Sequence, residues 1–150
     1  MKALLLLVLA ASPASARPVH GSASAGGSLL GTGEGDGSRL RADVEIDVET
    51  SRYGGLLALR AFDKDHEGLL CGGLVYEGAA ARPRLVLALH ADVGVDLAAR
   101  APLVGGGIRA TLFVVGPLAL AYDGGAYVVI DGVDRSRLVL SGAAMLAVAW

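Results

Sequence analysis

Residues 39–50 alternate strictly between apolar and charged side chains, and this feature most limits what the chain can fold into. Leu, Ala, Val and Ile fill the even positions 40–48, whereas Arg, Asp and Glu fill the odd positions 41–49. Successive side chains leave an extended strand on opposite faces, so a period of two indicates a strand with two unlike faces. Weaker alternation runs through most of the remaining chain.

Turn-forming stretches divide the chain into eight segments of roughly ten to fourteen residues. We expect strands over 19–30, 39–50, 53–62, 69–77, 84–97, 104–115, 118–131 and 137–150. In the fifth of these, Leu85, Leu87 and Leu89 oppose Ala88, His90 and Asp92. In the third, Leu57, Leu59 and Ala61 share a face opposite Arg60. The seventh either continues through Asp123-Gly124-Gly125 or divides there. No segment has helical spacing with caps, so we expect essentially no helix.

The first sixteen residues have the layout of a secretory signal peptide. Lys2 precedes the apolar run 3–11, and Ala14-Ser15-Ala16 is a small-residue cleavage site. We therefore expect residues 1–16 to be removed and 17–150 to form one domain. Without Lys2 the chain has 12 basic and 15 acidic residues and no Lys/Arg cluster, so nucleic-acid binding is not supported. The single cysteine, Cys71, excludes an internal disulfide.

Alternation alone does not decide which face meets water, because a soluble sandwich buries its apolar face and a membrane barrel turns it toward lipid. Three properties favour lipid. The segments are long enough for tilted strands to cross a bilayer. Their apolar faces carry no charge, and their opposite faces carry fewer charges than a soluble exterior usually does. Besides a soluble sandwich and a non-catalytic membrane barrel, a third alternative is an outer-membrane enzyme that acts on lipid. Such an enzyme would need a His/Ser/Asp cluster at the outer rim of the barrel.

The chain ends on Leu146-Ala147-Val148-Ala149-Trp150, an alternating strand with a final aromatic residue. This ending resembles the terminal strand of small bacterial outer-membrane β-barrels. The resemblance implies an all-β, antiparallel up-and-down (meander) barrel of about eight strands, of the transmembrane type. It also implies that the barrel-insertion machinery reads Leu146, Val148 and Trp150, and that outer-membrane lipid surrounds the barrel.

In a barrel of this kind the charged face points into the lumen. Buried carboxylates need cationic partners, so we predict a network of ion pairs that plugs the lumen and is not an ion pathway. Small residues of the first strand would make room for it. The predicted members are Arg41, Asp43, Glu45, Asp47, Glu49, Arg60, His90, Asp92 and Arg109, with Arg137 as a further candidate.

Residues 63–68 resemble the opening of a calcium loop, D-x-D-x-[DN]-G. Asp63, Asp65 and Glu67 would supply the oxygen ligands, but position twelve is Leu74 rather than the closing Glu. A solvated acidic turn is the favoured interpretation, weak Ca²⁺ binding the alternative, and we expect no other cofactor.

Two further patterns support neither catalysis nor nucleotide binding. His90 and Asp92 share a strand face, but no recognisable nucleophile accompanies them, and Gly105-Gly106-Gly107 leads into a strand rather than a nucleotide-binding helix. We therefore expect a non-enzymatic bacterial outer-membrane protein with a structural, adhesion or envelope-lipid contact role. The alternative is a soluble periplasmic or extracellular β-barrel or sandwich that binds a small apolar ligand. The sequence leaves its oligomeric state open.

Overall fold

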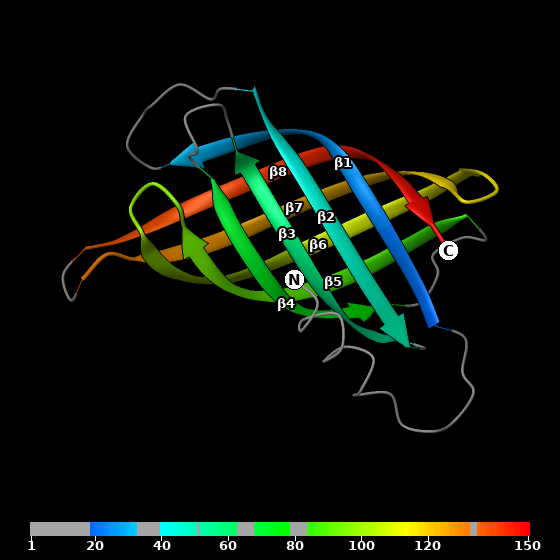
Figure 1. The fold of residues 1–150 in the computed structure, drawn as a ribbon, viewed down its shortest axis with the longest axis horizontal. Helices are drawn as coiled ribbons and strands as arrows, with labels where there is room; N and C mark the ends of the chain where they lie inside the picture. The colour runs from blue at the N-terminus through cyan, green and yellow to red at the C-terminus, as the bar shows by residue number, and fades with distance from the viewer. Residues whose placement is uncertain (1–18, 33–39, 51, 63–67, 79–83, 133–134) are drawn as a thin grey trace, which may run out of the picture.

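The computed structural model is a closed all-β barrel of eight antiparallel strands (Figure 1). The structure describes residues 19–32, 40–50, 52–62, 68–78, 84–132 and 135–150. The strands follow one another round the barrel in chain order, and β1 pairs with β8 to close it. They are β1 (Val19–Thr32), β2 (Leu40–Thr50), β3 (Tyr53–Phe62), β4 (Leu69–Glu77), β5 (Leu85–Asp96), β6 (Ala101–Val115), β7 (Leu118–Ile130) and β8 (Ser136–Ala149). The predicted up-and-down barrel is confirmed.

The strand bounds differ from the sequence-based ones at two places that matter. β6 begins at Ala101 instead of 104, because Ala101 pairs with Asp96 across a short turn. β7 runs unbroken through Asp123 and the two glycines after it, each of which is paired on both sides. No helix long and apolar enough to cross a lipid bilayer occurs in the described part of the chain.

The strands are strongly staggered. Cross-strand pairs followed once round the barrel from Ser22 return to β1 at Thr32, ten residues further along. The path passes through Asp47, Leu56, Gly73, Asp92, Gly105, Tyr127 and Val139. Closing a barrel with such a stagger requires strands tilted by about 35–45° and leaves an interior that side chains fill. Residues far apart along the chain therefore meet at one level of the lumen.

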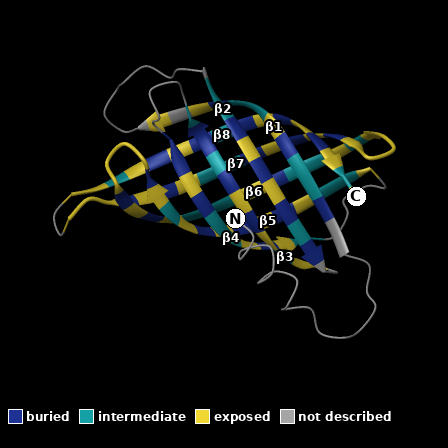
Figure 2. Cartoon of the chain, in the orientation of Figure 1, coloured by how far each residue is buried: buried dark blue, intermediate teal, exposed yellow. Residues whose placement is uncertain are grey.

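Buried and exposed residues alternate along the strands (Figure 2). In β5, Leu89 and Val93 are 54% and 65% exposed, whereas His90 and Asp92 are 6% and 2% exposed. The apolar face therefore points outward and the charged face inward. A soluble protein that binds an apolar ligand would need the opposite orientation, so the structure contradicts that alternative.

One bulge interrupts the alternation where β2 meets β3. Ala42 pairs with Phe62 but Val44 pairs with Leu59, so two β3 residues stand opposite Asp43. The extra residue, Ala61, has a φ of 47° and is fully buried. A residue in the left-handed region is one of the ways in which a strand accommodates a bulge. The prediction that Ala61 shares the outward face was wrong, because the bulge turns both Arg60 and Ala61 inward.

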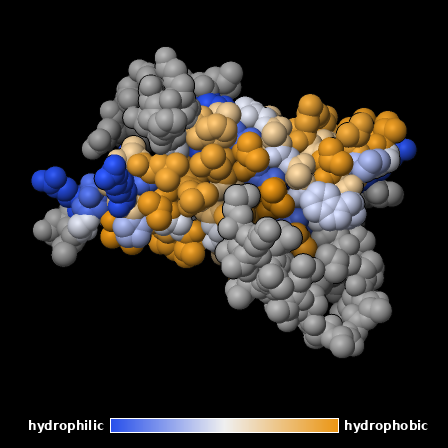
Figure 3. Space-filling view, in the orientation of Figure 1, coloured by the Kyte–Doolittle hydropathy of each residue, from blue (hydrophilic) through white to orange (hydrophobic). Residues whose placement is uncertain are grey.

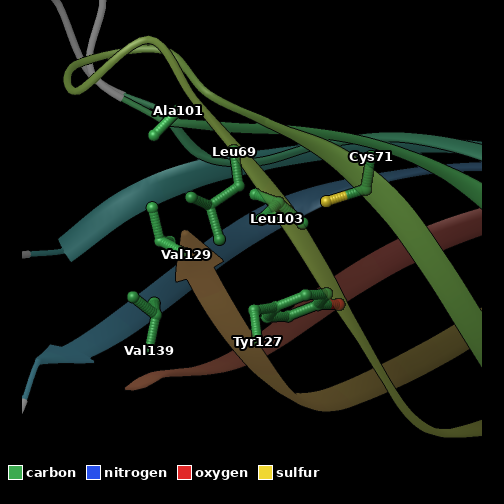
Figure 4. Packing of buried hydrophobic residues seen from close by; sticks show 7 residues of the cluster. All are labelled: Leu69, Cys71, Ala101, Leu103, Tyr127, Val129 and Val139. Atoms are coloured by element: carbon green, nitrogen blue, oxygen red, sulfur yellow. The ribbon is translucent and has the colours of Figure 1, made fainter. Parts of the chain in front are cut away.

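Apolar residues line the inner wall toward both ends of the barrel. Toward the end that carries the β3–β4, β5–β6 and β7–β8 connections, one cluster includes the ring of Tyr127 (Figure 4). It consists of Leu69, Cys71, Ala101, Leu103, Tyr127, Val129 and Val139. Small residues make up the cluster toward the β6–β7 turn: Ala119, Ala121, Ala143, Met145 and Ala147. Charged side chains occupy the space that these clusters leave.

Candidate functional site in the barrel lumen

The structure places the predicted lumen residues inside the barrel. Asp43, Glu45, Asp47, Glu49, Arg60, His90, Asp92 and Arg109 are all buried. Arg41 is half-buried, and its Nη1 lies 3.5 Å from the carbonyl oxygen of Ala61. These side chains come from β2, β3, β5 and β6, and each lies on the inward parity of its strand. They are brought together into contacts that the sequence alone did not specify.

Arg60 of β3 is the centre of the network and is 1% exposed. Its Nη1 lies 2.6 Å from Asp123 Oδ1, and its Nη2 lies 3.3 Å from Glu45 Oε2. The same Nη2 lies 3.7 Å from Asp92 Oδ2. The planar guanidinium group presents several N–H donors in fixed directions, so one arginine can serve carboxylates from three strands.

His90 lies between two of these carboxylates. Its Nδ1 is 2.8 Å from Asp92 Oδ2, and its Nε2 is 3.1 Å from Asp123 Oδ2. Each ring nitrogen therefore faces a carboxylate oxygen, and the Nδ1–Asp92 contact has the geometry of a hydrogen bond. Tyr127 of β7 donates its hydroxyl hydrogen to Asp92 Oδ2 at 3.0 Å, and its ring centroid lies 5.8 Å from Arg60 Cζ.

Arg109 of β6 serves the carboxylates nearer the β6–β7 turn. It is ion-paired with Glu45 and, through Nη1 at 3.0 Å, with Asp47 Oδ1. Ser22 of β1 donates a hydrogen bond to the same Asp47 carboxylate. Arg60 and Arg109 therefore share Glu45, which joins the two halves of the network.

Separate contacts lie toward the opposite end of the barrel. Asp43 accepts a hydrogen bond from the backbone N–H of Ala61 and so holds the bulge. Asp96 pairs with Arg137 and also accepts hydrogen bonds from the N–H groups of Ala98 and Ala99, at 3.0 and 2.9 Å. The Asp96 carboxylate therefore fixes the β5–β6 turn.

Glycines make room for the network on β4, β6 and β7. A Cβ added at Gly107 would lie 2.7 Å from His90 Nε2, and one at Gly73 would lie 2.6 Å from Asp92 Oδ1. A Cβ at Gly125 would lie 2.7 Å from the Tyr127 hydroxyl oxygen. Each distance is too short for non-bonded atoms, so the absence of a side chain at these glycines permits the close packing of the network. On the first strand, which was also expected to give room, Ser24 and Ser28 are small buried residues, and Ser22 donates a hydrogen bond to Asp47.

The buried part of the network has more carboxylates than cations. Among the described residues, the buried carboxyl groups are those of Asp43, Glu45, Asp47, Glu49, Asp92, Asp96 and Asp123, whereas the buried basic side chains are those of Arg60, His90 and Arg109. Asp43 Oδ2 and Asp92 Oδ1 have no hydrogen-bond partner among the described residues. Each of these three basic side chains contacts carboxyl groups of other strands, so the arrangement ties strands together.

Asp123 and Tyr127 belong to the network, yet sequence reasoning did not select them. Asp123 was missed because the Asp-Gly-Gly run resembles a turn. The alternation of Leu118, Leu120 and Tyr122 with Ala119 and Ala121 was the available signal, because it gives residues 123, 125 and 127 the inward parity. Asp123 supplies the shortest ion pair that Arg60 makes, at 2.6 Å, so its omission removed a central partner.

The other predicted sites divide into two groups. Leu146, Val148 and Trp150 point outward and are 72%, 49% and 60% exposed. The calcium-loop candidates Asp63, Asp65 and Glu67, and the signal segment 1–16, lie outside the described residues. Within the described residues, no group of three or more His, Cys, Asp or Glu side chains is placed to hold a metal ion.

A charged, filled lumen inside an apolar exterior is the architecture of small transmembrane β-barrels. No protein-family model and no curated protein matches the chain. Among solved structures, a chain from the de novo design of transmembrane β-barrels superposes with a TM-score of 0.54 at 12% identity, covering 91% of this chain and 98% of that one. This likeness shows the fold.

Two natural proteins were also found. Neisserial surface protein A has a TM-score of 0.47 at 11% identity, covering 87% of this chain and 95% of its own. Ail, the attachment invasion locus protein of Yersinia pestis, has a TM-score of 0.44 at 12% identity, covering 88% and 97%.

Proposed function

We propose that the protein is a small integral β-barrel of the bacterial outer membrane with a side-chain-filled lumen and a structural, adhesion or envelope-lipid contact role. The observation that carries this proposal is the inverted polarity of the barrel. Leu74, Val93 and Leu146 are 73%, 65% and 72% exposed on the outside, while Arg60 and Asp92 are 1% and 2% exposed inside.

Lipid is the environment that suits this exterior. Hydrophobic side chains cover the middle of the visible face, and the most hydrophilic residues gather at its left-hand tip (Figure 3). Soluble monomers rarely expose contiguous apolar patches larger than a few hundred Å². A closed barrel also pairs its backbone groups internally, as the hydrocarbon region requires, and described strands of 9 to 15 residues are long enough to cross it.

Outward aromatic residues support a membrane interface at one end of the barrel. Tyr53 and Tyr76 are cross-strand partners with ring centroids 5.1 Å apart, and both are exposed. Trp150 is exposed at the same end, which also carries the β6–β7 turn (Figure 1). Aromatic residues form girdles where transmembrane barrels meet the headgroups, so these three would mark one boundary of the hydrocarbon region.

A lipid-face charge scan tests this proposal. Arginine near the bilayer midplane of a barrel costs about 2–4 kcal/mol, but only about 0–1 kcal/mol near the interface. We expect Leu89→Arg, in the middle of β5, to lower the free energy of unfolding in lipid vesicles by the larger amount. Leu97→Arg, at the β5–β6 turn, is the matched control and should cost little.

The location is tested on cell envelopes. The protein should require detergent for extraction and should migrate differently in gels before and after heating, because a folded barrel resists denaturation by the detergent. Release by osmotic shock without detergent, together with equal costs for the two arginine variants, would refute the membrane assignment.

The filled lumen supports a plug rather than a pore. Arg60, His90 and Arg109 span the interior between carboxylates of several strands, and an eight-stranded barrel encloses only enough space for side chains. We expect no steady ionic conductance when the purified protein is inserted into planar bilayers. Regular single-channel steps from the wild-type protein would contradict the plug.

The outward face of β8 is the proposed contact for the barrel-insertion machinery. Leu146 and Val148 present apolar side chains there, next to Trp150. Leu146→Asp should reduce assembly in cells much more than Ala144→Asp on the same face, while both variants still fold in detergent micelles. Equal loss for the two variants in cells would indicate a general effect of charge on the lipid face.

A further inference from the structure

Two adjoining hollows lie where β5 meets β6, at the barrel end that carries the β6–β7 turn. The first, the rim hollow, has a volume of about 480 Å³ and is bordered by Arg84, Phe113, Val114, Val115 and Gly116. The second, the outer groove, has a volume of about 520 Å³, and its lining includes Leu85, Ala110, Leu112, Leu120, Ala144 and Leu146. The two adjoin, because Leu85 follows Arg84 in the chain and pairs with Leu112, the residue before Phe113.

Arg84 is the charged residue of the rim hollow. It is exposed at the start of β5, and no described carboxyl group forms an ion pair with it. The preceding residues 79–83 contain no Asp or Glu. Asp47, Glu49 and Glu77, the described carboxyl groups of this barrel end, border a different cavity that opens into the lumen. Within the described chain, Arg84 therefore presents a positive charge without a carboxylate partner at the edge of an apolar hollow.

The outer groove continues from the rim hollow along the outside of the barrel. Leu112, Leu120 and Leu146 are all exposed there, and the groove's lining includes no charged side chain. The small side chains of Ala110 and Ala144 leave room between the leucines. Methylene groups gain free energy when they pack against such a lining, so the groove suits a hydrocarbon chain.

The order of the two hollows matches the depth profile of a lipid leaflet. We have assigned the exposed Tyr53, Tyr76 and Trp150 to one boundary of the hydrocarbon region, and Arg84 precedes β5 at the same end of the barrel. The guanidinium group of Arg84 therefore lies at the level of the headgroups, and the outer groove lies at the level of the acyl chains. A phospholipid has its phosphate group and its acyl chains in this order.

The chemistry of Arg84 indicates which phospholipid fits. A guanidinium group matches a phosphate group through paired N–H donors. A zwitterionic headgroup carries its own ammonium group, which compensates the phosphate, whereas a lipid with net negative charge does not.

We propose that the rim hollow and the outer groove bind one anionic phospholipid, with its phosphate group on Arg84 and an acyl chain along Leu112. This inference rests on the proposed function, because it requires the outer face of the barrel to lie in a lipid leaflet. The membrane assignment itself does not require any preference among lipids.

A single indole in the outer groove provides the reporter. Trp150 is the only tryptophan of the chain, so Leu112→Trp in a Trp150→Phe background places one indole beside the proposed acyl chain. The full-length protein is refolded into phosphatidylcholine vesicles that contain increasing amounts of phosphatidylglycerol with brominated chains, which quench an indole in contact with them. Brominated phosphatidylcholine in the same vesicles gives the reference curve. Leu120→Trp, on the cross-strand partner of Leu112, is the second reporter if the first does not fold.

We expect the anionic lipid to be favoured by about fivefold at this indole, the factor that one arginine near a membrane surface provides. Arg84→Gln should abolish the preference. Arg52→Gln is the matched control, because it removes an exposed arginine from the β2–β3 turn at the same barrel end, and it should leave the preference unchanged. Heat-modifiable mobility verifies the folding of each variant. Sodium phosphate should not reduce the preference more than sodium chloride at the same ionic strength.

Four results would overturn the proposal. They are equal quenching by the two brominated lipids, an unchanged preference in folded Arg84→Gln, an equal loss in Arg52→Gln, and specific displacement by soluble phosphate. The third would identify only a general charge effect at the rim, and the fourth a site for soluble anions. Absence of quenching by either brominated lipid would refute the membrane assignment as well, so the two failures are distinguishable.

Discussion

Replacing Arg60 by methionine removes a side chain that contacts three carboxylates in the lumen. Methionine has a similar length and fills most of the same space, so the change isolates charge and hydrogen bonding from packing. Asp123 would lose a partner at 2.6 Å, and Glu45 one at 3.3 Å. Both residues lie inside the barrel, out of contact with bulk water.

The expected cost follows from this burial. Breaking a buried ion pair by removing one partner costs about 3–5 kcal/mol, because the remaining charge stays buried without compensation. Glu45 keeps Arg109, and Asp123 keeps His90, so the three contacts do not add and one such loss is the reasonable magnitude. At about 2 kcal/mol per M of urea, a loss of about 4 kcal/mol lowers the unfolding midpoint by about 2 M.

The assay is equilibrium urea unfolding of the refolded barrel in lipid vesicles, followed by circular dichroism and by heat-modifiable mobility. Arg135→Met, which removes an exposed arginine near the β7–β8 connection, is the control and should change stability by less than about 0.5 kcal/mol. The double variant Arg60→Met/Asp123→Asn should recover part of the loss, because it also removes the orphaned charge. If Arg60→Met were as stable as Arg135→Met, the network would not hold the barrel together.

Two further predictions concern the space and the hydrogen bonds around this network. Gly107→Ala should destabilise the barrel by about 1–3 kcal/mol, because the added Cβ would collide with the backbone carbonyl oxygen of Gly124 and would also lie 2.7 Å from His90 Nε2. Gly55→Ala, whose nearest neighbour would be 3.8 Å away, should be tolerated in the same unfolding assay. Tyr127→Phe should cost about 1–3 kcal/mol by leaving a buried carboxylate without its hydroxyl donor, whereas Tyr122→Phe on the outer face should cost less than about 0.5 kcal/mol. Equal losses within either pair would contradict the inward packing.

Much of the fold was predictable because alternation is a local property. A strand places side chains on opposite faces wherever it runs, so the charges of 41–49 and the leucines of 85–89 separate without knowledge of the neighbouring strands. The candidate lumen residues followed from the same parity. Asp123 did not, because an Asp-Gly-Gly run is compatible with a turn until both neighbouring strands are known.

Local reasoning also failed where two strands constrain each other. The parity of β3 placed Ala61 beside Leu57 and Leu59, but the bulge opposite Asp43 turns Ala61 inward. Nothing within residues 53–62 signals this, because a bulge is a mismatch between two strands and not a property of one.

The amino-acid sequence by itself determined the number of strands, their two unlike faces and the residues that bear charge. The reason is that a period of two is a local property, which each segment shows without reference to its neighbours. The tertiary structure alone decided that the charged face lies inside, that Arg60 meets Asp123, and that the bulge turns Ala61 inward. These contacts depend on the ten-residue stagger of the closed barrel, which brings distant positions to one level. That stagger arises only when β8 pairs with β1, so no single segment carries it.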